Sequence, residues 1–244
     1  MNGPNVWITG AGSGIGLAVA ERIATSTSRV IVSGRRLEPL AELAARHANV
    51  RALSLDVTDR DAVRQAVAEI GLIDIAILCA GTHRPTPASN FDAQSVRNLI
   101  DTNLMGIVNC VEALLPPMLE RGTGQLVLVG SVAGYRGLPT AAGYCASKAA
   151  VIALAEALRL DLADTGVDVR LVSPGFVDTP LTQENSFPMP DLITAEKAAQ
   201  HILKGLAKSG FEIAFPARFA FAMRCLRLLP DRLYFPLMRK VTGC

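Results

Sequence analysis

The sequence predicts an α/β fold: a single doubly wound Rossmann-type domain, with helices on both faces of a mostly parallel, about seven-stranded sheet. Short apolar runs alternate with longer segments of helical periodicity, an order typical of βαβ units. The apolar runs are continuous, as expected of strands that are buried on both faces. With 244 residues, 50% of them hydrophobic and 19% charged, the chain is long enough to bury such a core.

The elements follow one another in a regular order along the chain. Six apolar runs mark the expected strands, at residues 6–9, 30–33, 51–55, 73–79, 125–130 and 167–172. Helical patterns lie near 15–25, 37–48, 59–70, 92–120, 144–164 and 195–207. Segment 181–191 contains two prolines and no clear period, so we expect a loop that covers a substrate site. One domain over 1–215 is expected to hold the cofactor and substrate sites, followed by a dependent tail over 216–244.

The first expected strand runs into a glycine-rich turn, Thr9-Gly10-Ala11-Gly12-Ser13-Gly14-Ile15-Gly16, and then into a helical pattern. Glycines permit a tight turn and let a pyrophosphate approach the backbone, while the N–H groups at the helix start face the phosphates. The glycine spacing departs from the common G-x-G-x-x-G fingerprint, so an ordinary strand–helix turn is the alternative.

Two arginines, Arg35 and Arg36, follow the second expected strand. An acidic residue near this position would bind the ribose 2′-hydroxyl of NAD, whereas arginine suits the 2′-phosphate of NADP. No acid lies between Arg29 and Glu38. A dinucleotide bound here is therefore expected to be NADP(H) in preference to NAD(H); the alternative is a pair of solvated surface charges.

Tyr144 and Lys148 open a helical pattern at positions i and i+4, so their side chains project from the same face. A tyrosine with an ordinary pKa of about 10 is a poor acid at neutral pH. A neighbouring ammonium stabilises the phenolate and lowers that pKa, so the pair could pass a proton to or from a carbonyl oxygen. The alternatives are a buried amphipathic tyrosine and a lysine on a solvated face.

Several motifs in their order along the chain resemble the short-chain dehydrogenase/reductase family over about residues 4–215. The glycine turn is similar to its T-G-x-x-x-G-x-G motif, and Pro174-Gly175-Phe176-Val177-Asp178-Thr179 is similar to its P-G-x-V-x-T motif. Cys79-Ala80-Gly81 resembles its N-A-G motif, with Cys79 in place of the usual asparagine. Asn103, Ser131, Tyr144 and Lys148 match its catalytic residues in order and spacing.

The resemblance implies a carbonyl reductase or alcohol dehydrogenase that transfers a hydride between NADP(H) and a carbonyl or secondary alcohol. Tyr144 would give the proton, Ser131 would bind the carbonyl oxygen, Lys148 would hold the nicotinamide ribose, and Asn103 would order a water. The implied cofactor contacts are Gly10, Ser13, Gly14, Ile15, Gly16, Arg35, Arg36, Asp56, Val57, Cys79, Ala80, Gly81, Asn103, Tyr144, Lys148, Pro174, Gly175, Val177 and Thr179. A β-ketoacyl thioester reductase and a non-enzymatic NADP(H)-binding sensor or scaffold are the alternative functions.

Residues expected near the substrate are mainly apolar, which indicates a hydrophobic carbonyl compound. They are Tyr135, Leu138, Phe176 and the loop that contains Phe187. His83 and Arg84 could also approach the site, although ordinary loop packing is the preferred interpretation for both.

Charge and cysteine usage restrict the partners. The net charge of +2 divides into +5 for the tail and −3 for the rest, so no basic patch for nucleic acid runs through the body. The five cysteines show no metal-binding spacing, so no metal is expected and the thiols are expected to be reduced in a cytoplasmic setting.

The tail and one helix suggest larger assemblies. Phe219, Met223 and Leu226 fall on one helical face, which favours packing on the body or on another subunit; the alternative is peripheral contact of 216–244 with an anionic membrane. The family resemblance implies a homodimer or homotetramer, for which Leu154 and Leu158 could provide contacts, together with Leu162.

Overall fold

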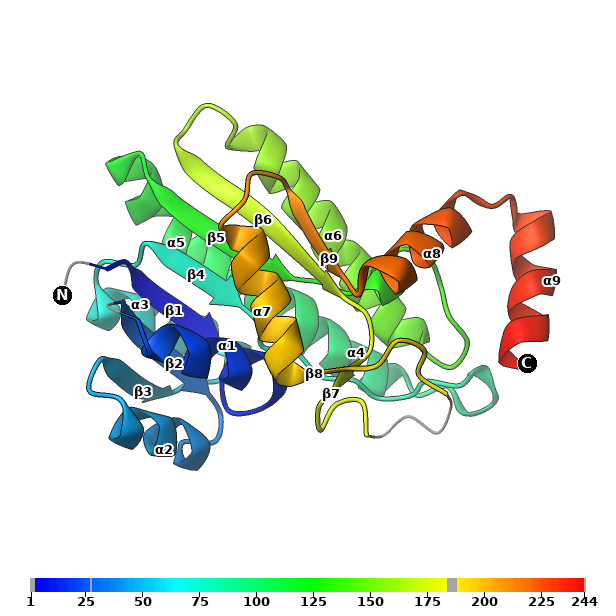
Figure 1. Cartoon of the computed structure of the whole chain (residues 1–244), viewed down its shortest axis with the longest axis horizontal. Helices are drawn as coiled ribbons and strands as arrows, with labels where there is room; N and C mark the ends of the chain where they lie inside the picture. Colours follow the sequence, from blue (N-terminus) through cyan, green and yellow to red (C-terminus); the bar gives the residue numbers. More distant parts are fainter. Residues whose placement is uncertain (1–2, 27, 184–187, 244) are drawn as a thin grey trace.

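The structure, a computed structural model, describes residues 3–26, 28–183 and 188–243. Its centre is a seven-stranded sheet in the order β3-β2-β1-β4-β5-β6-β9, and each neighbouring pair is parallel (Figure 1). This confirms the predicted fold class. The strands are β1 (Asn5–Thr9), β2 (Arg29–Gly34), β3 (Val50–Ser54), β4 (Ile75–Leu78), β5 (Gly124–Val129), β6 (Val167–Pro174) and β9 (Glu212–Phe215). The sequence patterns located all of these except β9.

Helices cover both faces of the sheet (Figure 1). One face packs against α3 (Arg60–Ile70), α5 (Gly106–Arg121), α6 (Ala142–Asp161) and α8 (Ala217–Leu228). The other face packs against α1 (Gly14–Ala24), α2 (Glu38–Arg46) and α7 (Ala195–Leu206). Neighbouring strand residues point to opposite faces, so Trp7 lies in the first core and Ile8 in the second. Both faces of each strand are therefore apolar, as the continuous runs predicted.

Trp7, the single tryptophan of the chain, is completely buried in β1. Its Nε1 donates a hydrogen bond to Ser33 Oγ of β2 at 3.0 Å. A buried indole N–H needs such a partner, because leaving it without one would cost the free energy of desolvation. The bond links the two strands close to their carboxyl ends.

One long helical stretch runs from Ala93 to Arg121 along the first face. It consists of α4 (Ala93–Ile100), a π-helical turn over Asp101–Met105, and α5. By length and composition alone this stretch could cross a membrane, but its buried residues pack into the sheet core. Single π-helical turns occur often at functional sites, and this one contains Asn103.

Two turns, two short strands and a last helix complete the described chain. They are 3-10 turns at Ala88–Asn90 and Val132–Gly134, strands β7 (Val177–Asp178) and β8 (Ile193–Thr194), and helix α9 (Asp231–Thr242). The expected loop over 181–191 lies between the paired strands β7 and β8. Phe187, expected near the substrate, lies outside the described residues.

The apolar face predicted in the tail packs against the body. Met223 of α8 is buried in the first core, while Phe219 and Leu226 are partly buried against it. Helix α9 lies at the end of the molecule furthest from β3 (Figure 1). Leu162, considered above for a subunit contact, is itself buried in the core.

Candidate functional site

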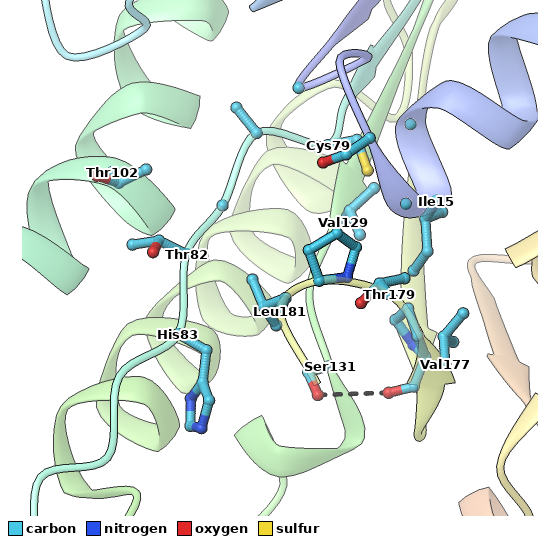
Figure 2. A pocket seen from close by; sticks show the side chains of 18 of the residues that line it. Ile15, Cys79, Thr82, His83, Thr102, Val129, Ser131, Val177, Thr179 and Leu181 are labelled. Carbon is cyan, nitrogen blue, oxygen red and sulfur yellow. Dashed lines mark hydrogen bonds between the residues drawn. The ribbon is translucent and has the colours of Figure 1, made fainter. Parts of the chain in front are cut away.

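A cleft of about 840 Å³ opens at the carboxyl ends of the central strands. Residues that follow β1, β2, β4, β5 and β6 line it, and they come from segments far apart in the sequence (Figure 2). The strand order reverses between β1 and β4, and open α/β sheets bind ligands at such a switch point. The volume lies in the range of cofactor and small-molecule sites.

The turn after β1 requires glycine because backbone segments approach closely. A Cβ on Gly10, whose φ is +67°, would lie 2.6 Å from the Cα of Ala80, and one on Gly16 would lie 2.5 Å from the carbonyl oxygen of Gly10. Thr9 Oγ1 accepts hydrogen bonds from the N–H groups of Cys79 and Ala80 at 3.0 and 3.1 Å. The glycine turn and the turn after β4 are thereby held together.

The start of α1 suits an anion. The Ser13 side chain at its N-cap makes no capping hydrogen bond, and the first turn carries no acidic residue. First-turn N–H groups and the helix dipole both favour a negative charge at this position. A Cβ on Gly14 would lie 3.0 Å from Thr179 Cγ2, so only glycine keeps this part of the cleft open.

Positive charge dominates the described lining of the cleft. Arg35, Arg36 and Lys148 contribute cations, and Asp56 contributes the one acid. Both arginines are exposed after β2, as the sequence placed them. This balance suits a ligand that carries several phosphates.

Tyr144 and Lys148 lie on α6, and both line the cleft. Lys148 is 5% exposed, and its Nζ donates a hydrogen bond to the Val129 carbonyl at 2.9 Å. Nζ lies 5.9 Å from the centre of the Tyr144 ring.

Burial lowers the pKa of Lys148 to about 8. Burial also raises the pKa of Tyr144 to about 12, against the effect of a hydrogen bond with Ser131. The expected lowering of the Tyr144 pKa by Lys148 was therefore wrong for this structure: desolvation outweighs the Ser131 hydrogen bond, and the Lys148 charge is not among the causes of the shift.

Ser131 begins the 3-10 turn after β5, and its hydroxyl is held from two sides. Its Oγ accepts a hydrogen bond from the N–H of Ala133 at 3.1 Å and donates one to the Pro174 carbonyl at 3.3 Å (Figure 2). The hydroxyl is thus fixed between the ends of β5 and β6.

Asn103 is completely buried and, unlike the other residues predicted to be catalytic or to contact the cofactor, does not line the cleft. Its Nδ2 donates to the Thr82 carbonyl at 2.9 Å and to Ser147 Oγ at 3.0 Å, while its Oδ1 accepts from the N–H of Thr82 at 2.7 Å. The side chain therefore fixes the loop after β4 against α6. Both Nδ2 hydrogens are used in these contacts, while Oδ1 keeps a second acceptor position.

Cys79, which stands where the resembling family has asparagine, lines the cleft as a neutral thiol. Burial raises its pKa to about 11, against the effects of the Lys148 charge and a hydrogen bond from the Gly16 backbone. Among the described residues, no group of three or more His, Cys, Asp or Glu side chains could hold a metal ion.

Two residues expected near the substrate lie elsewhere. Tyr135 does not line the cleft, because its hydroxyl donates a hydrogen bond to the Glu212 carboxylate of β9. Leu138 packs against the first core. Both predicted positions were wrong, and for Tyr135 the reason is that its partner strand β9 follows many residues later.

His83 and Phe219 have positions that the sequence patterns did not favour. His83 lines the cleft, and its ring meets the Tyr144 ring edge-on with centroids 4.8 Å apart, so loop packing was the wrong preference. Phe219 of α8 also lines the cleft, 5.3 Å from the Phe176 ring. A Cβ on Gly175 would lie 2.7 Å from the Phe219 ring, so glycine at this position allows α8 to pack close to the cleft.

Three further lining residues, Thr82, Thr102 and Pro180, were not predicted, because single residues of this kind carry no periodic signal. Gly12 of the predicted glycine turn lines the cleft, as do Leu181 and Thr182 of the segment expected to cover a substrate site.

The comparisons with known proteins agree with this geometry. A family model described as short chain dehydrogenase matches residues 4–188. An uncharacterized oxidoreductase of Myxococcus xanthus is 39% identical, over 96% of this chain and 96% of its own. A short chain dehydrogenase of Burkholderia cenocepacia in complex with NADP is similar in structure, with a TM-score of 0.85 and 26% identity, covering 98% of this chain and 97% of that one. A short-chain dehydrogenase of Sphingobium yanoikuyae in complex with NADPH has a TM-score of 0.83 and 29% identity, covering 91% of each chain.

Proposed function

Because the chain belongs to the short-chain dehydrogenase family, we propose that it is an NADP(H)-dependent oxidoreductase acting on a carbonyl or secondary alcohol. The observation that carries the proposal is the presence of Ser131, Tyr144 and Lys148 in the same cleft as the glycine turn. A sensor that only binds the cofactor has no need of these three side chains together.

The residues of the cleft fit a phosphorylated dinucleotide. The glycine turn and the start of α1 would hold the pyrophosphate, and Arg35 and Arg36 would hold the 2′-phosphate. When bound, the nicotinamide supplies the hydride chemistry. Relatives of similar structure that contain NADP or NADPH support this choice of cofactor.

In this proposal Tyr144 is the proton donor. Its hydroxyl, protonated at neutral pH because burial raises the pKa to about 12, would donate to the developing alkoxide. The Ser131 hydroxyl, on turning its proton away from the Pro174 carbonyl, would donate a hydrogen bond to the same substrate oxygen and stabilise its charge. The positive charge of Lys148 would stabilise the phenolate that Tyr144 becomes after it donates the proton. Asn103 would act as a positioning residue through Thr82 and Ser147.

Apolar side chains indicate the class of substrate. Phe176, Leu181 and Phe219 all line the cleft. Such a wall favours a hydrophobic ketone, aldehyde or secondary alcohol over a charged one.

The test follows NADPH absorbance with purified protein and a panel of hydrophobic ketones and aldehydes. Tyr144→Phe should lower kcat by roughly 10²- to 10⁴-fold, because the variant cannot donate the proton. Its dissociation constant for NADPH should change by less than about twofold, because the cofactor contacts remain. Tyr135→Phe is the matched control, since its hydroxyl binds Glu212 outside the cleft lining and its loss should leave kcat nearly unchanged. Turnover of Tyr144→Phe at the wild-type rate would reject the assignment.

Cofactor preference has its own test. Replacing Arg35 or Arg36 with alanine should lower kcat/KM for NADPH by roughly 10- to 100-fold, which is the effect of losing a charged hydrogen bond to phosphate. The value for NADH should hardly change, because NADH has no 2′-phosphate. Arg22→Ala on the exposed side of α1 is the control. An equal loss of kcat/KM with both cofactors would mean that these arginines do not bind the 2′-phosphate.

A further inference from the structure

The two C-terminal helices, α8 and α9, present an unusual number of exposed apolar side chains. Of thirteen large apolar residues that are exposed in the described chain, six lie on these helices: Phe221, Leu228, Leu233, Phe235, Leu237 and Val241. Leu233, Leu237 and Val241 follow at i, i+4 and i+8, so they form one stripe along α9. Phe221 and Leu228 lie on the side of α8 away from buried Met223. Exposed apolar groups gathered in this way mark an interaction surface.

Arg136 of the body contacts both helices, in addition to the packing of α8 on the core and a hydrogen bond from the Tyr234 hydroxyl to the Gly137 carbonyl. Arg136 donates hydrogen bonds to the carbonyls of Leu226 and Leu229, at 3.0 and 2.5 Å, where α8 ends. It also forms an ion pair with Asp231 at 2.5 Å, and its guanidinium lies 3.8 Å from the centre of the Tyr234 ring. The exposed apolar residues are therefore displayed on an anchored pair of helices.

The same helices carry an excess of positive charge. Two of their charged groups are used within the fold, since Arg224 pairs with Glu212 and Asp231 pairs with Arg136. Five further cations remain exposed: Arg218, Arg227, Arg232, Arg239 and Lys240. Within the described part of the chain, none of these five forms an ion pair.

We propose that α8 and α9 form a docking surface for a membrane rich in anionic lipids. Apolar side chains would enter the boundary between headgroups and acyl chains, and the cations would bind lipid phosphates, as in interfacial amphipathic helices. A second copy of the chain fits this surface less well. A twofold contact would bring the same five cations against themselves, and like charges at an interface oppose binding.

The position of α8 connects the surface to the cleft. Phe219 lies on the inner side of α8 and lines the cleft, whereas Phe221 points outward from the same helix. Docking would therefore place one wall of the cleft close to the bilayer. This step rests on the proposed function, and it assigns to the cleft a carbonyl substrate that partitions into lipid.

The test is sedimentation of the full-length protein with vesicles. Wild-type protein should pellet with phosphatidylcholine vesicles containing about 30% phosphatidylglycerol and much less with phosphatidylcholine alone. About 0.5 M salt should release most of it. Two triple variants should each lower the partition coefficient about tenfold or more: Arg232→Gln with Arg239→Gln and Lys240→Gln, and Leu233→Ser with Leu237→Ser and Val241→Ser.

Matched controls replace exposed residues of the body. Lys197→Gln and Lys204→Gln on α7 combined with Lys208→Gln just after it, and Leu72→Ser with Leu119→Ser, should pellet like wild type. Equal pelleting of the charge variant and wild type would overturn the proposal, as would absence of wild-type protein from the anionic pellet. A wild-type dimer that the Leu233 variant converts to monomer, seen by sedimentation velocity, would assign the surface to a second copy instead.

Failure here is separable from failure of the proposed enzymatic function. NADPH oxidation with a water-soluble ketone, measured without vesicles, should be the same for wild type and both triple variants. Vesicle binding without turnover would count against the enzymatic function alone, and turnover without vesicle binding would count against the docking surface alone.

Discussion

Lys148 shows how a residue useful for catalysis can weaken the fold. Its ammonium is almost completely buried, and its one hydrogen bond to the described chain goes to the Val129 carbonyl. Burial consequently lowers its pKa to about 8, below the ordinary value of 10.5. The folded protein therefore binds this proton more weakly than the unfolded chain does, which costs stability wherever the lysine is charged in both states.

Lys148→Met should stabilise the apoprotein by roughly 1–3 kcal/mol at pH 7. The depressed pKa corresponds to a cost of about 3 kcal/mol, from which we subtract about 1 kcal/mol for the lost hydrogen bond to Val129. The gain should be complete below about pH 8, decline as pH rises and be gone before 10.5, where the lysine is neutral in both states and only the loss of the hydrogen bond remains. Urea denaturation at several pH values measures it. Lys197→Met on α7 is an exposed control; equal stability of Lys148→Met and wild type at pH 7 would show that desolvation is not the cause of the shift.

The catalytic residues were predictable because short-range spacing carries their signal. Tyr144 and Lys148 lie one helical turn apart, and Ser131 directly follows a strand, so local pattern places all three at the sheet edge. Tyr135 was not predictable in this way. Its hydroxyl is directed by Glu212, a residue 77 positions later whose strand was not recognised.

At the scale of elements, the strand–helix turn depends on glycine where backbone meets backbone. Gly16→Ala would place a methyl group 2.5 Å from the Gly10 carbonyl oxygen, so α1 must shift away from β1. We expect a loss of about 1–3 kcal/mol in the free energy of unfolding, together with weaker NADPH binding.

Gly137 provides the control for this prediction. A Cβ there would meet no atom within 4 Å, and Gly137→Ala should change the free energy of unfolding by less than about 1 kcal/mol. Urea denaturation of both variants decides the matter. Equal stability of the two would mean that the turn has room to relax.

Arg136 joins the body to two helices at once. Arg136→Met should remove the hydrogen bonds to the end of α8 and the contact of the guanidinium with the Tyr234 ring, leaving the Tyr234 hydroxyl bonded to the Gly137 carbonyl. Amide hydrogen exchange over 231–242 should then become faster by about tenfold or more, while amides of buried Ala220 and Met223 keep their protection. Arg60→Met, which breaks an exposed ion pair with Glu112, is the control. Unchanged exchange over 231–242 would show that α9 is held by other contacts.

Long periodic elements were easier to predict than short ones. The stretch over 93–121 and helix α6 have enough turns for their apolar period to be clear. Strand β9 has four residues and begins with Glu212, so no pattern marks it. It is a strand because β6 offers an open edge, which is a property of the assembled sheet.

For the whole molecule, the two cores lie on opposite faces of the sheet, and the cleft lies at the carboxyl ends of its strands. NADPH that binds this cleft in the folded protein alone should stabilise the entire fold. At 100 times its dissociation constant, the expected gain is about 2.7 kcal/mol, or a rise in Tm of roughly 5–10 °C.

Thermal unfolding with and without NADPH measures this gain. NADH at the same concentration should raise Tm less, because Arg35 and Arg36 find no 2′-phosphate on it. Equal shifts with the two cofactors would contradict the proposed preference, and absence of any shift would contradict binding in the cleft.

The buried position of Trp7 gives the protein an optical probe of its own. Since the chain has a single indole, fluorescence excited selectively in tryptophan comes from one place in β1, two residues before Thr9 and the glycine turn. Unfolding would expose that indole to water and move its emission to longer wavelength. Reduced nicotinamide absorbs where indole emits, so a bound cofactor would quench the same emission by energy transfer. Stability and cofactor binding can therefore be followed in one cuvette without any label.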